Sequence, residues 1–315
     1  MIAVNLALEL VLMQAIGIFM RKTGIVSKDF SPQLTSFLMK VSVPCLIFKS
    51  ITGSEFSLNE LKNCFVIVLV GFICVGLSLL ISHIAYKIKP NCSTGRIIRY
   101  GLAFCQFSFM GIPVMQTLFG DMGTFYYTFF VIPVRLGYYG LPETLLTPPE
   151  LKKGKGQGFG KALKHGLLNP QLITVAISLV FWVTGLKLPG PIFNCVKTIG
   201  GLCSPLALIL CGVTIAGYDF KRLLRWEYAL IPVLRTIMMP AIFIGVSFVM
   251  GLCGVDPLIR HIMVIYCALP VTGLLPMYTI QYDPNPEDQL SAAGACFISA
   301  MMSAVTLPFW YTLIL

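Results

Sequence analysis

Three basic residues stand inside long apolar stretches of this sequence, where a charge is costly. Lys40, Arg135 and Arg235 lie well within such stretches, and Glu9 is the main carboxylate deep enough to neutralise one of them. A guanidinium binds a carboxylate through two parallel hydrogen bonds, and an ammonium acts as a point charge. Lys40 and Arg135 therefore predict a site for a small organic anion. The alternative for Arg135 is a bond to backbone carbonyls at helix breaks, and for Arg235 we favour carbonyls freed by Pro240.

Neutral hydrogen-bond donors accompany these cations. Each one alone is more often a helix-to-helix hydrogen bond than a ligand, but their position near the predicted helix breaks favours binding. Beside Lys40 and Arg135, we predict these substrate-binding residues: Ser42, Gln106, Ser108 and Thr272. No paired carboxylates, histidine cluster or activated nucleophile is visible in the sequence. It therefore predicts no enzyme, metal site or cofactor.

Prolines interrupt two apolar runs in a way that a membrane helix tolerates only beside protein or a watery cavity. Pro113 lies in the middle of the run 104–121, so residues 110–112 cannot complete a regular turn, and Pro270 lies in the run 267–283. Such paired broken segments indicate a transporter's binding site near the membrane midplane. We predict that the following residues shape the cavity: Pro44, Gly111, Pro113, Pro205, Pro270, Gly273 and Pro276.

Composition predicts an all-α membrane protein. The 315 residues are 57% hydrophobic and 11% charged, with a mean hydropathy of +0.84. A span needs about 20 apolar residues. The sequence predicts ten transmembrane helices, near 2–20, 31–51, 64–86, 97–119, 123–146, 167–186, 191–217, 226–251, 258–281 and 289–314. The first is not a cleaved signal, because its basic residues follow the apolar run.

The distribution of basic residues sets the expected orientation. The net charge is +10, and most of the 23 Lys and Arg residues lie in the odd-numbered connections between predicted spans. Because cytoplasmic loops carry the excess of Lys and Arg, these connections are expected in the cytoplasm and both termini outside it. The basic runs are then solvated, lipid-facing surface of a protein in the cell membrane. No nucleic-acid partner is predicted.

An internal repeat divides the sequence into halves. Gly24 and Pro44 recur as Gly185 and Pro205, 161 residues later, and the same offset carries Arg99 onto Arg260. Five spans per half is an odd number, so the second half is expected to enter the membrane from the opposite side. The prediction is an inverted repeat of residues 1–146 and 167–315, in which broken helices 4 and 9 are partners.

Residues 147–166 join these halves and are predicted to be a cytoplasmic linker, because Gly and Lys at this density do not pack. The run GKGQGFGK lacks the pattern of a phosphate-binding loop, which disfavours ATP as the energy source. Coupling to protons or sodium stays open. A membrane-embedded sensor or channel-like protein that binds an organic anion is the alternative function.

The sequence resembles the auxin efflux carrier family, which includes PIN-type exporters and bacterial malate/malonate permeases. The resemblance rests on five short motifs spread through the chain: Val43-Pro44-Cys45-Leu46, Phe109-Met110-Gly111-Ile112-Pro113, Asn169-Pro170, Ser204-Pro205-Leu206-Ala207 and Ala268-Leu269-Pro270. It implies a scaffold domain, a transport domain and a carboxylate bound where helices 4 and 9 cross. The family often has Asn at the positions of Lys40 and Gln106, and the added charge of Lys40 favours a more anionic substrate. The expected partners are this anion, the lipid bilayer and, as an open alternative, a second copy of the chain.

Overall fold

Helices account for all regular structure in the part of the chain that the structure describes. The computed structural model describes residues 2–27, 29–54, 57–88, 93–148, 170–216, 228–282 and 286–314. The isolated β-bridge between Cys105 and Val271 is the exception to helix in these ranges. The all-α prediction is confirmed for them. The predicted linker 147–166 lies almost wholly outside the described residues.

The chain forms two compact units, and each unit draws on both halves of the sequence. Unit 1 consists of Met1–Val68, Ser108–Val131 and Leu167–Gly217, and unit 2 of Leu69–Phe107, Ile132–Gly166 and Tyr218–Leu315. The unit boundaries therefore follow packing, whereas the predicted repeat follows sequence order. The inverted repeat over five spans stays a prediction.

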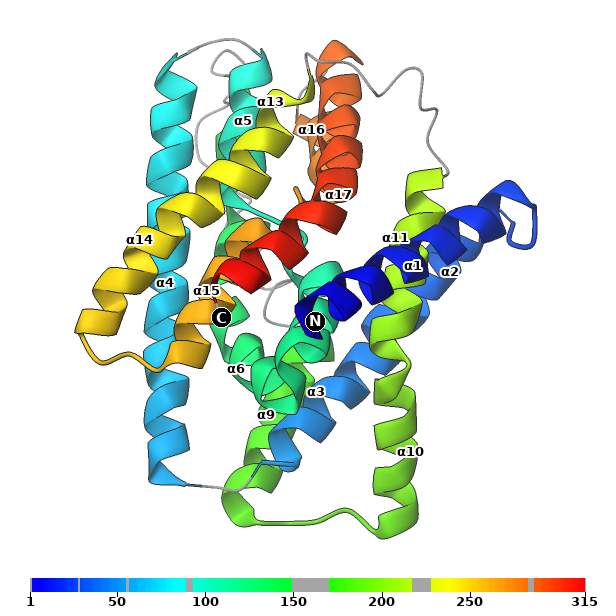
Figure 1. Ribbon diagram of the computed structural model, residues 1–315, viewed down its shortest axis with the longest axis vertical. Helices are drawn as coiled ribbons and strands as arrows, with labels where there is room; N and C mark the ends of the chain where they lie inside the picture. Colours follow the sequence, from blue (N-terminus) through cyan, green and yellow to red (C-terminus); the bar gives the residue numbers. More distant parts are fainter. Residues whose placement is uncertain are drawn as a thin grey trace. The chain divides into compact units, whose positions relative to one another are not determined.

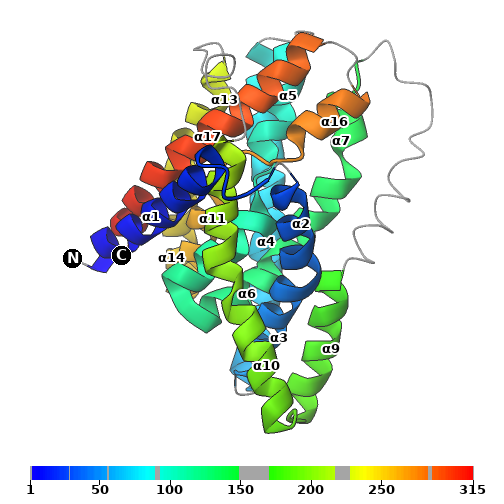
Figure 2. The same cartoon turned by 90° about the vertical axis from the view of Figure 1, so that its right-hand side faces the viewer.

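Unit 1 is built from helices of the first spans of each half. Its described elements are α1 (Ile2–Lys22), α2 (Phe30–Phe37), η1 (Leu38–Ser42), α3 (Val43–Thr52), the start of α4 (Leu58–Ile88), most of η2 (Phe107–Gly111), the first part of α6 (Ile112–Gly140), α9 (Pro170–Thr184), α10 (Gly190–Gly201) and α11 (Cys203–Ala216). α1 packs along α11, as both views show (Figures 1 and 2). The two backbones approach closely: a Cβ at Gly17 would lie 2.0 Å from the carbonyl oxygen of Ile209.

Unit 2 holds the remaining helices. They are most of α4, α5 (Ser93–Ala103), the end of α6, α7 (Pro142–Leu146), α13 (Leu230–Val233), η5 (Leu234–Met238), α14 (Met239–Leu252), α15 (Pro257–Ala268), α16 (Leu275–Tyr282) and α17 (Pro286–Ile314). α17 packs against α13, α15 and α16 (Figure 1). An aromatic cluster fills part of this core, where the ring centres of Tyr100 and Phe104 are 5.0 Å apart and that of Tyr138 lies 6.2 Å from Tyr100.

Five helical segments among the described residues are long and apolar enough to cross a membrane. They are Phe30–Thr52, Leu58–Lys87, Gly190–Thr214, Leu230–Leu252 and Asp288–Ile314. Two of the other predicted spans are divided into shorter pieces. The span predicted at 97–119 is split into α5, an open segment, η2 and the start of α6, and that at 258–281 is split into α15 and α16. The protein is thus a multi-pass membrane protein, and the number of ten spans stays a prediction.

Each π-helical turn described here ends two residues before a proline. η1 precedes Pro44, η2 precedes Pro113 and η5 precedes Pro240. Proline lacks an N–H and clashes with the carbonyl four residues back, and a π-turn absorbs this defect without opening the helix. The irregular turn predicted at 110–112 is therefore a π-turn. The chain opens earlier, at residues 104–106.

Two turns of unit 1 are alike at the positions that the repeat relates. Gly24 and Gly185 have φ angles of 75° and 69°, a left-handed conformation that favours glycine. Each glycine follows a threonine, Thr23 or Thr184, whose Oγ1 donates to the carbonyl oxygen four residues earlier, at 2.8 and 2.6 Å. This local likeness is what the predicted repeat requires at these positions.

α6 turns sharply where the sequence predicts a connection between two spans. Gly120 has φ 65° and ψ −154°, so the helix is kinked there. The next residue, Asp121, forms an ion pair with Lys49 at 2.8 Å and accepts a hydrogen bond from Gln116 Nε2 at 2.9 Å. Burial acts to raise the pKa of the Asp121 carboxyl, but the hydrogen bonds from Lys49 and Gln116 outweigh it, so that this pKa is lowered.

Candidate functional site at the helix crossover

The open segments of two helices pair with each other in unit 2. Residues 104–106 separate α5 from η2, and residues 269–274 separate α15 from α16. Cys105 and Val271 form an antiparallel bridge, and the Gln106 N–H donates to the carbonyl oxygen of Pro270 at 3.0 Å. We call these two segments the crossover. The structure thus pairs an open segment from each of the two helices that were predicted to be broken, although the first opens at 104–106 and not at the predicted 110–112.

Arg235 supplies hydrogen-bond donors to the helix ends that flank the crossover. It is fully buried, and its guanidinium donates to the carbonyl oxygens of Leu102 at 2.6 Å, Tyr266 at 3.3 Å and Leu269 at 3.4 Å. The last carbonyls of a helix lack partners within the helix, and an unpaired carbonyl in hydrocarbon costs several kcal/mol. One buried arginine therefore stabilises the ends of both α5 and α15.

This finding corrects the predicted partners of Arg235. The sequence argument assigned it to carbonyls freed by Pro240, four residues beyond Thr236. The freed carbonyl oxygen of Thr236 instead accepts the indole N–H of Trp310 at 2.8 Å. Because a tryptophan from α17 satisfies this acceptor, the arginine is left to the crossover. Backbone carbonyls as the kind of partner were predicted correctly.

Side chains from α17 satisfy further backbone groups of the crossover. Ser299 Oγ accepts the N–H of Val271 at 3.1 Å, and Cys296 Sγ lies 3.0 Å from the carbonyl oxygen of Thr272 as a donor. These groups are all buried. A broken helix survives in a membrane because protein replaces the lost bonds, as here.

One face of the crossover remains accessible. Gln106 is half-buried and Gly273 is exposed. The Gln106 Nε2 atom lies only 3.5 Å from the position that a Cβ of residue 273 would take. Among the described residues the Gln106 side-chain amide has no hydrogen-bond partner. An amide that is partly covered and has spare donors and an acceptor can bind a polar ligand.

Arg135 and Thr272 belong to the same unit and lie in its interior. Arg135 is only 2% exposed, and its guanidinium carbon lies 5.7 Å from the ring centre of Phe107, directly after the open segment. Thr272 is fully buried and its hydroxyl makes a short hydrogen bond with the hydroxyl of Tyr138. The sequence analysis did not predict Tyr138 as a functional residue. The feature that could have indicated it is the Tyr-Tyr pair at 138–139, three residues after Arg135.

The other predicted ligands belong to unit 1. Lys40 is exposed on η1 and has no hydrogen-bond or ion-pair partner among the described residues. Ser42 donates to the carbonyl oxygen of Ile199 at 2.9 Å, and Ser108 donates to Gln171 Oε1 at 2.8 Å. Both serines thus join helices of unit 1, which is the structural role considered for each neutral donor.

The predicted cavity-shaping residues take two kinds of position. Gly111 ends η2, and Pro44 follows the π-turn η1 that absorbs its defect. Pro205 and Pro276 lie in the first turns of α11 and α16, where a missing N–H costs little. Pro270 and Gly273 lie in the crossover. The carbonyl oxygen of Pro113 accepts Thr117 Oγ1 at 2.9 Å and Ser204 Oγ at 3.4 Å.

Comparison with known proteins places the whole chain in one family. A family model described as membrane transport protein matches residues 2–141 and 159–311. The chain belongs to the membrane transport protein family. It is also 22% identical over 317 residues to the uncharacterized transporter MJ1031 of Methanocaldococcus jannaschii, an alignment that covers 98% of each chain.

Membership of the membrane transport protein family confirms the resemblance to auxin efflux carriers at the level of the family. It also decides between classes of protein: this family member is a transporter and not an enzyme. The malate/malonate permease subtype and the substrate stay predictions. The crossover in unit 2 is the candidate site because both broken helices of this transporter expose polar groups there.

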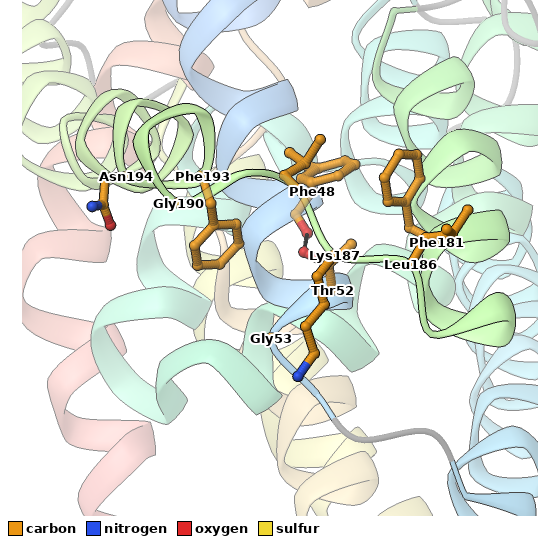
Figure 3. A pocket seen from close by; sticks show the side chains of 10 residues that line it. Phe48, Thr52, Gly53, Phe181, Leu186, Lys187, Gly190, Phe193 and Asn194 are labelled. Atoms are coloured by element: carbon orange, nitrogen blue, oxygen red, sulfur yellow. Dashed lines mark hydrogen bonds between the residues drawn. The ribbon is translucent and has the colours of Figure 1, made fainter.

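A hollow lies in unit 1. It has a volume of about 310 Å³ and is lined by α3, α9, α10 and the connection between the last two (Figure 3). Phe48 and Phe181 face each other edge to face with ring centres 5.3 Å apart, and Lys187 is the charged residue of the lining. Thr52 Oγ1 donates to the carbonyl oxygen of Phe48 at 2.7 Å. None of the sequence-predicted site residues lines this pocket.

Proposed function

We propose that this transporter is a secondary carrier that moves a small organic anion bound at the crossover of unit 2. The observation that carries the proposal is the pairing of the two open segments, with the Gln106 amide accessible beside the exposed Gly273. Gly273 lets a ligand approach the backbone closely, and the amide can donate to a carboxylate oxygen.

Positive charge supports an anion as the ligand class. Arg135 and Arg235 are the two largest fully buried basic side chains of unit 2, and Arg235 is engaged with three carbonyls. Arg135 lies against Phe107, beside the open segment that carries Gln106. In a water-poor interior a cation favours a negatively charged guest over a neutral one. We therefore assign Arg135 the charge-balancing role.

Alternating access is the proposed mechanism. The ligand would bind at the crossover while one unit moves against the other, so that the site opens to each side of the membrane in turn. Thr272 positions the backbone of the crossover through its bond to Tyr138. Protons or sodium are the candidate coupling ions.

A thermal-shift screen of the purified protein tests the proposal. Monocarboxylates, dicarboxylates, aromatic acids and bulky steroid-like acids are added with and without sodium. A ligand that binds the folded state raises the melting temperature by mass action. We expect at least one carboxylate to do so for the wild type, and the shift to be lost in Gln106→Leu and Arg135→Gln.

The matched control is Gln33→Leu, the same substitution at an exposed position of α2 in unit 1. It is expected to keep the wild-type shift. A carboxylate shift that persists undiminished in both Gln106→Leu and Arg135→Gln would exclude the crossover as the binding site. A sensor or channel-like protein would bind the anion but would give no substrate-saturable uptake into proteoliposomes.

A further inference from the structure

A cluster of three side chains lies at the end of unit 2 where α4 ends and α5 begins. Tyr86 of α4 is its centre: the imidazole of His83 stacks on it with ring centres 6.3 Å apart, and the guanidinium carbon of Arg99 lies 5.4 Å from the Tyr86 ring centre. His83 and Tyr86 are three residues apart, so they share one face of the helix. The cluster therefore combines an imidazole and a guanidinium on one aromatic ring.

Two nitrogens of this cluster are buried without a partner. Among the described residues, neither Nε of Arg99 nor Nδ1 of His83 makes a hydrogen bond, although both atoms are covered. Among the described residues the Arg99 guanidinium forms no ion pair, and it lies against the face of Tyr86. A buried polar atom costs free energy unless it is hydrogen-bonded, so this cluster lacks acceptors among the described residues. The Arg99 side chain is only half-buried, so its other guanidinium nitrogens can reach an external acceptor.

Arg260 shows how the same residue type is satisfied when no ligand is needed. It lies 161 residues after Arg99, at the position that the predicted repeat relates to it. Its guanidinium donates to the carbonyl oxygens of Val255 at 3.1 Å and Ser247 at 3.4 Å. Arg260 thus caps backbone groups, whereas Arg99 has no carbonyl acceptor within the described part of the chain. The difference leaves the Arg99 guanidinium available for an external anion.

Local charge reinforces this reading. Arg96, one turn before Arg99, lies 3.8 Å from the Asp288 carboxylate, so that carboxylate is already matched with a cation. Lys87 is exposed and stands one turn after His83 on the same helix face. The cluster therefore carries an excess of positive charge at a helix end, where the membrane surface is expected. Basic pockets of this kind between membrane helices bind the phosphate groups of lipids.

We propose that Arg99, His83 and Tyr86 form a binding site for the phosphate group of an anionic phospholipid. The Nη atoms of Arg99, which are not among the covered nitrogens, donate to the phosphate oxygens. The ring of Tyr86 holds the guanidinium in place, and Lys87 adds charge at the rim. The acyl chains then lie along the apolar surface of α4, where Leu80 and Ile84 are exposed. The site is separate from the crossover and does not depend on the carried substrate.

The test is lipid binding to the purified, delipidated protein in detergent. Phosphatidylglycerol and phosphatidylcholine are each titrated, and bound lipid is counted by native mass spectrometry while the melting temperature is recorded. We expect phosphatidylglycerol to bind and stabilise, phosphatidylcholine to do neither, and Arg99→Gln to bind phosphatidylglycerol about tenfold more weakly, as for loss of one charged partner. The matched control Arg21→Gln, on α1 of unit 1, is expected to bind as the wild type does.

A separate arm with millimolar inorganic phosphate distinguishes the source of the anion. One possible result is that inorganic phosphate stabilises the wild type but not Arg99→Gln, while phosphatidylglycerol does not stabilise the wild type. The ligand is then a free phosphate, and the lipid proposal is wrong. Equal phosphatidylglycerol binding by wild type and Arg99→Gln would overturn the site, with water as the partner of the buried nitrogens. If Arg99→Gln fails to fold, Tyr86→Leu decides: weaker phosphatidylglycerol binding supports the site, and unchanged binding overturns it.

Discussion

Two kinds of helix defect occur in this protein, and they are stabilised in different ways. In the π-turns η1 and η5 the helix stays continuous, because the N–H groups of Val43 and Met239 donate to carbonyl oxygens five residues back, those of Leu38 and Leu234. At the crossover the helix opens completely, and its backbone groups are satisfied by Arg235 and by another open segment.

The difference teaches that proline alone does not decide where a membrane helix opens. A proline defect closes locally when one extra residue can be inserted into the turn. An open segment requires partners from elsewhere in the unit, and it can leave polar groups over for a ligand. We therefore expect changes at the crossover to affect stability and binding strongly, and changes at the π-turns to have small effects.

The largest expected effect comes from removing the arginine at the crossover. Arg235→Met should lower the free energy of unfolding by about 3 kcal/mol or more, because it leaves three buried carbonyls without their donor and each costs about 1–3 kcal/mol. The measurement is the melting temperature in detergent together with the yield of monodisperse protein. Arg260→Met, which removes hydrogen bonds to two carbonyls in a part-buried setting, is the control and should destabilise less. Equal losses for both variants would contradict the special role of the crossover.

The accessible amide of the crossover should affect binding without affecting stability. Gln106→Leu is expected to weaken binding of the stabilising carboxylate about tenfold or more, since a hydrogen bond to a charged group contributes about 1.5–3 kcal/mol. The melting temperature without ligand should stay within a few degrees of the wild type, because the side chain has no partner among the described residues. Titration calorimetry gives the affinity. A variant that binds normally would remove Gln106 from the site.

A change at a π-turn provides the opposite expectation. Pro240→Ala restores an N–H after η5, and Trp310 still satisfies the carbonyl of Thr236. The free energy of unfolding should change by less than about 1 kcal/mol, as for proline at a site whose backbone already accommodates it, which is well below the effect of Arg235→Met. Thermal unfolding of the purified variant is the measurement. A loss as large as that of Arg235→Met would mean that the π-turns are as sensitive as the crossover.

The smallest expected effect is a pH dependence at the kink of α6. Because the folded pKa of Asp121 is lowered below that of the unfolded chain, the ion pair with Lys49 adds stability above the ordinary carboxyl pKa. This stability is lost as the pH falls through the folded pKa. The gain is small because the Asp121 side chain is 49% exposed. In Asp121→Asn the melting temperature should fall less steeply at acid pH than in the wild type. An unchanged fall would show that other carboxylates cause the loss of stability in acid.

The sequence predicted the segments that break better than the contacts that hold them. Pro270 and Gly273 located one open segment directly, because both residues disfavour a helix interior. Pro113 placed the other only within nine residues, because its defect is absorbed by η2 and the chain opens at 104–106. Spacing along one chain does not reveal that Trp310 reaches Thr236 and leaves Arg235 to the crossover.

Candidate ligands were harder to predict than helix breaks. A serine in an apolar run looks the same in sequence whether it contacts substrate or another helix, and both Ser42 and Ser108 turn out to bond within unit 1. Gln106 differs from these two serines because its backbone lies in an open segment, which leaves its side chain without a partner among the described residues. Tyr138 was missed since aromatic residues are common in membrane helices, and its bond to Thr272 depends on tertiary structure.

Disulfide crosslinking tests most directly that the two open segments meet. The variant keeps Cys105, carries Val271→Cys and has its other cysteines replaced. A protease site is inserted into the linker 147–166, so that cleavage separates the two halves of the chain unless a disulfide joins them. Bridged residues of an antiparallel pair lie close enough for a disulfide. We predict that the halves stay joined after oxidation and separate after reduction, while the control Met277→Cys, exposed on α16, never joins them. Halves that separate under oxidation in Val271→Cys would contradict the crossover.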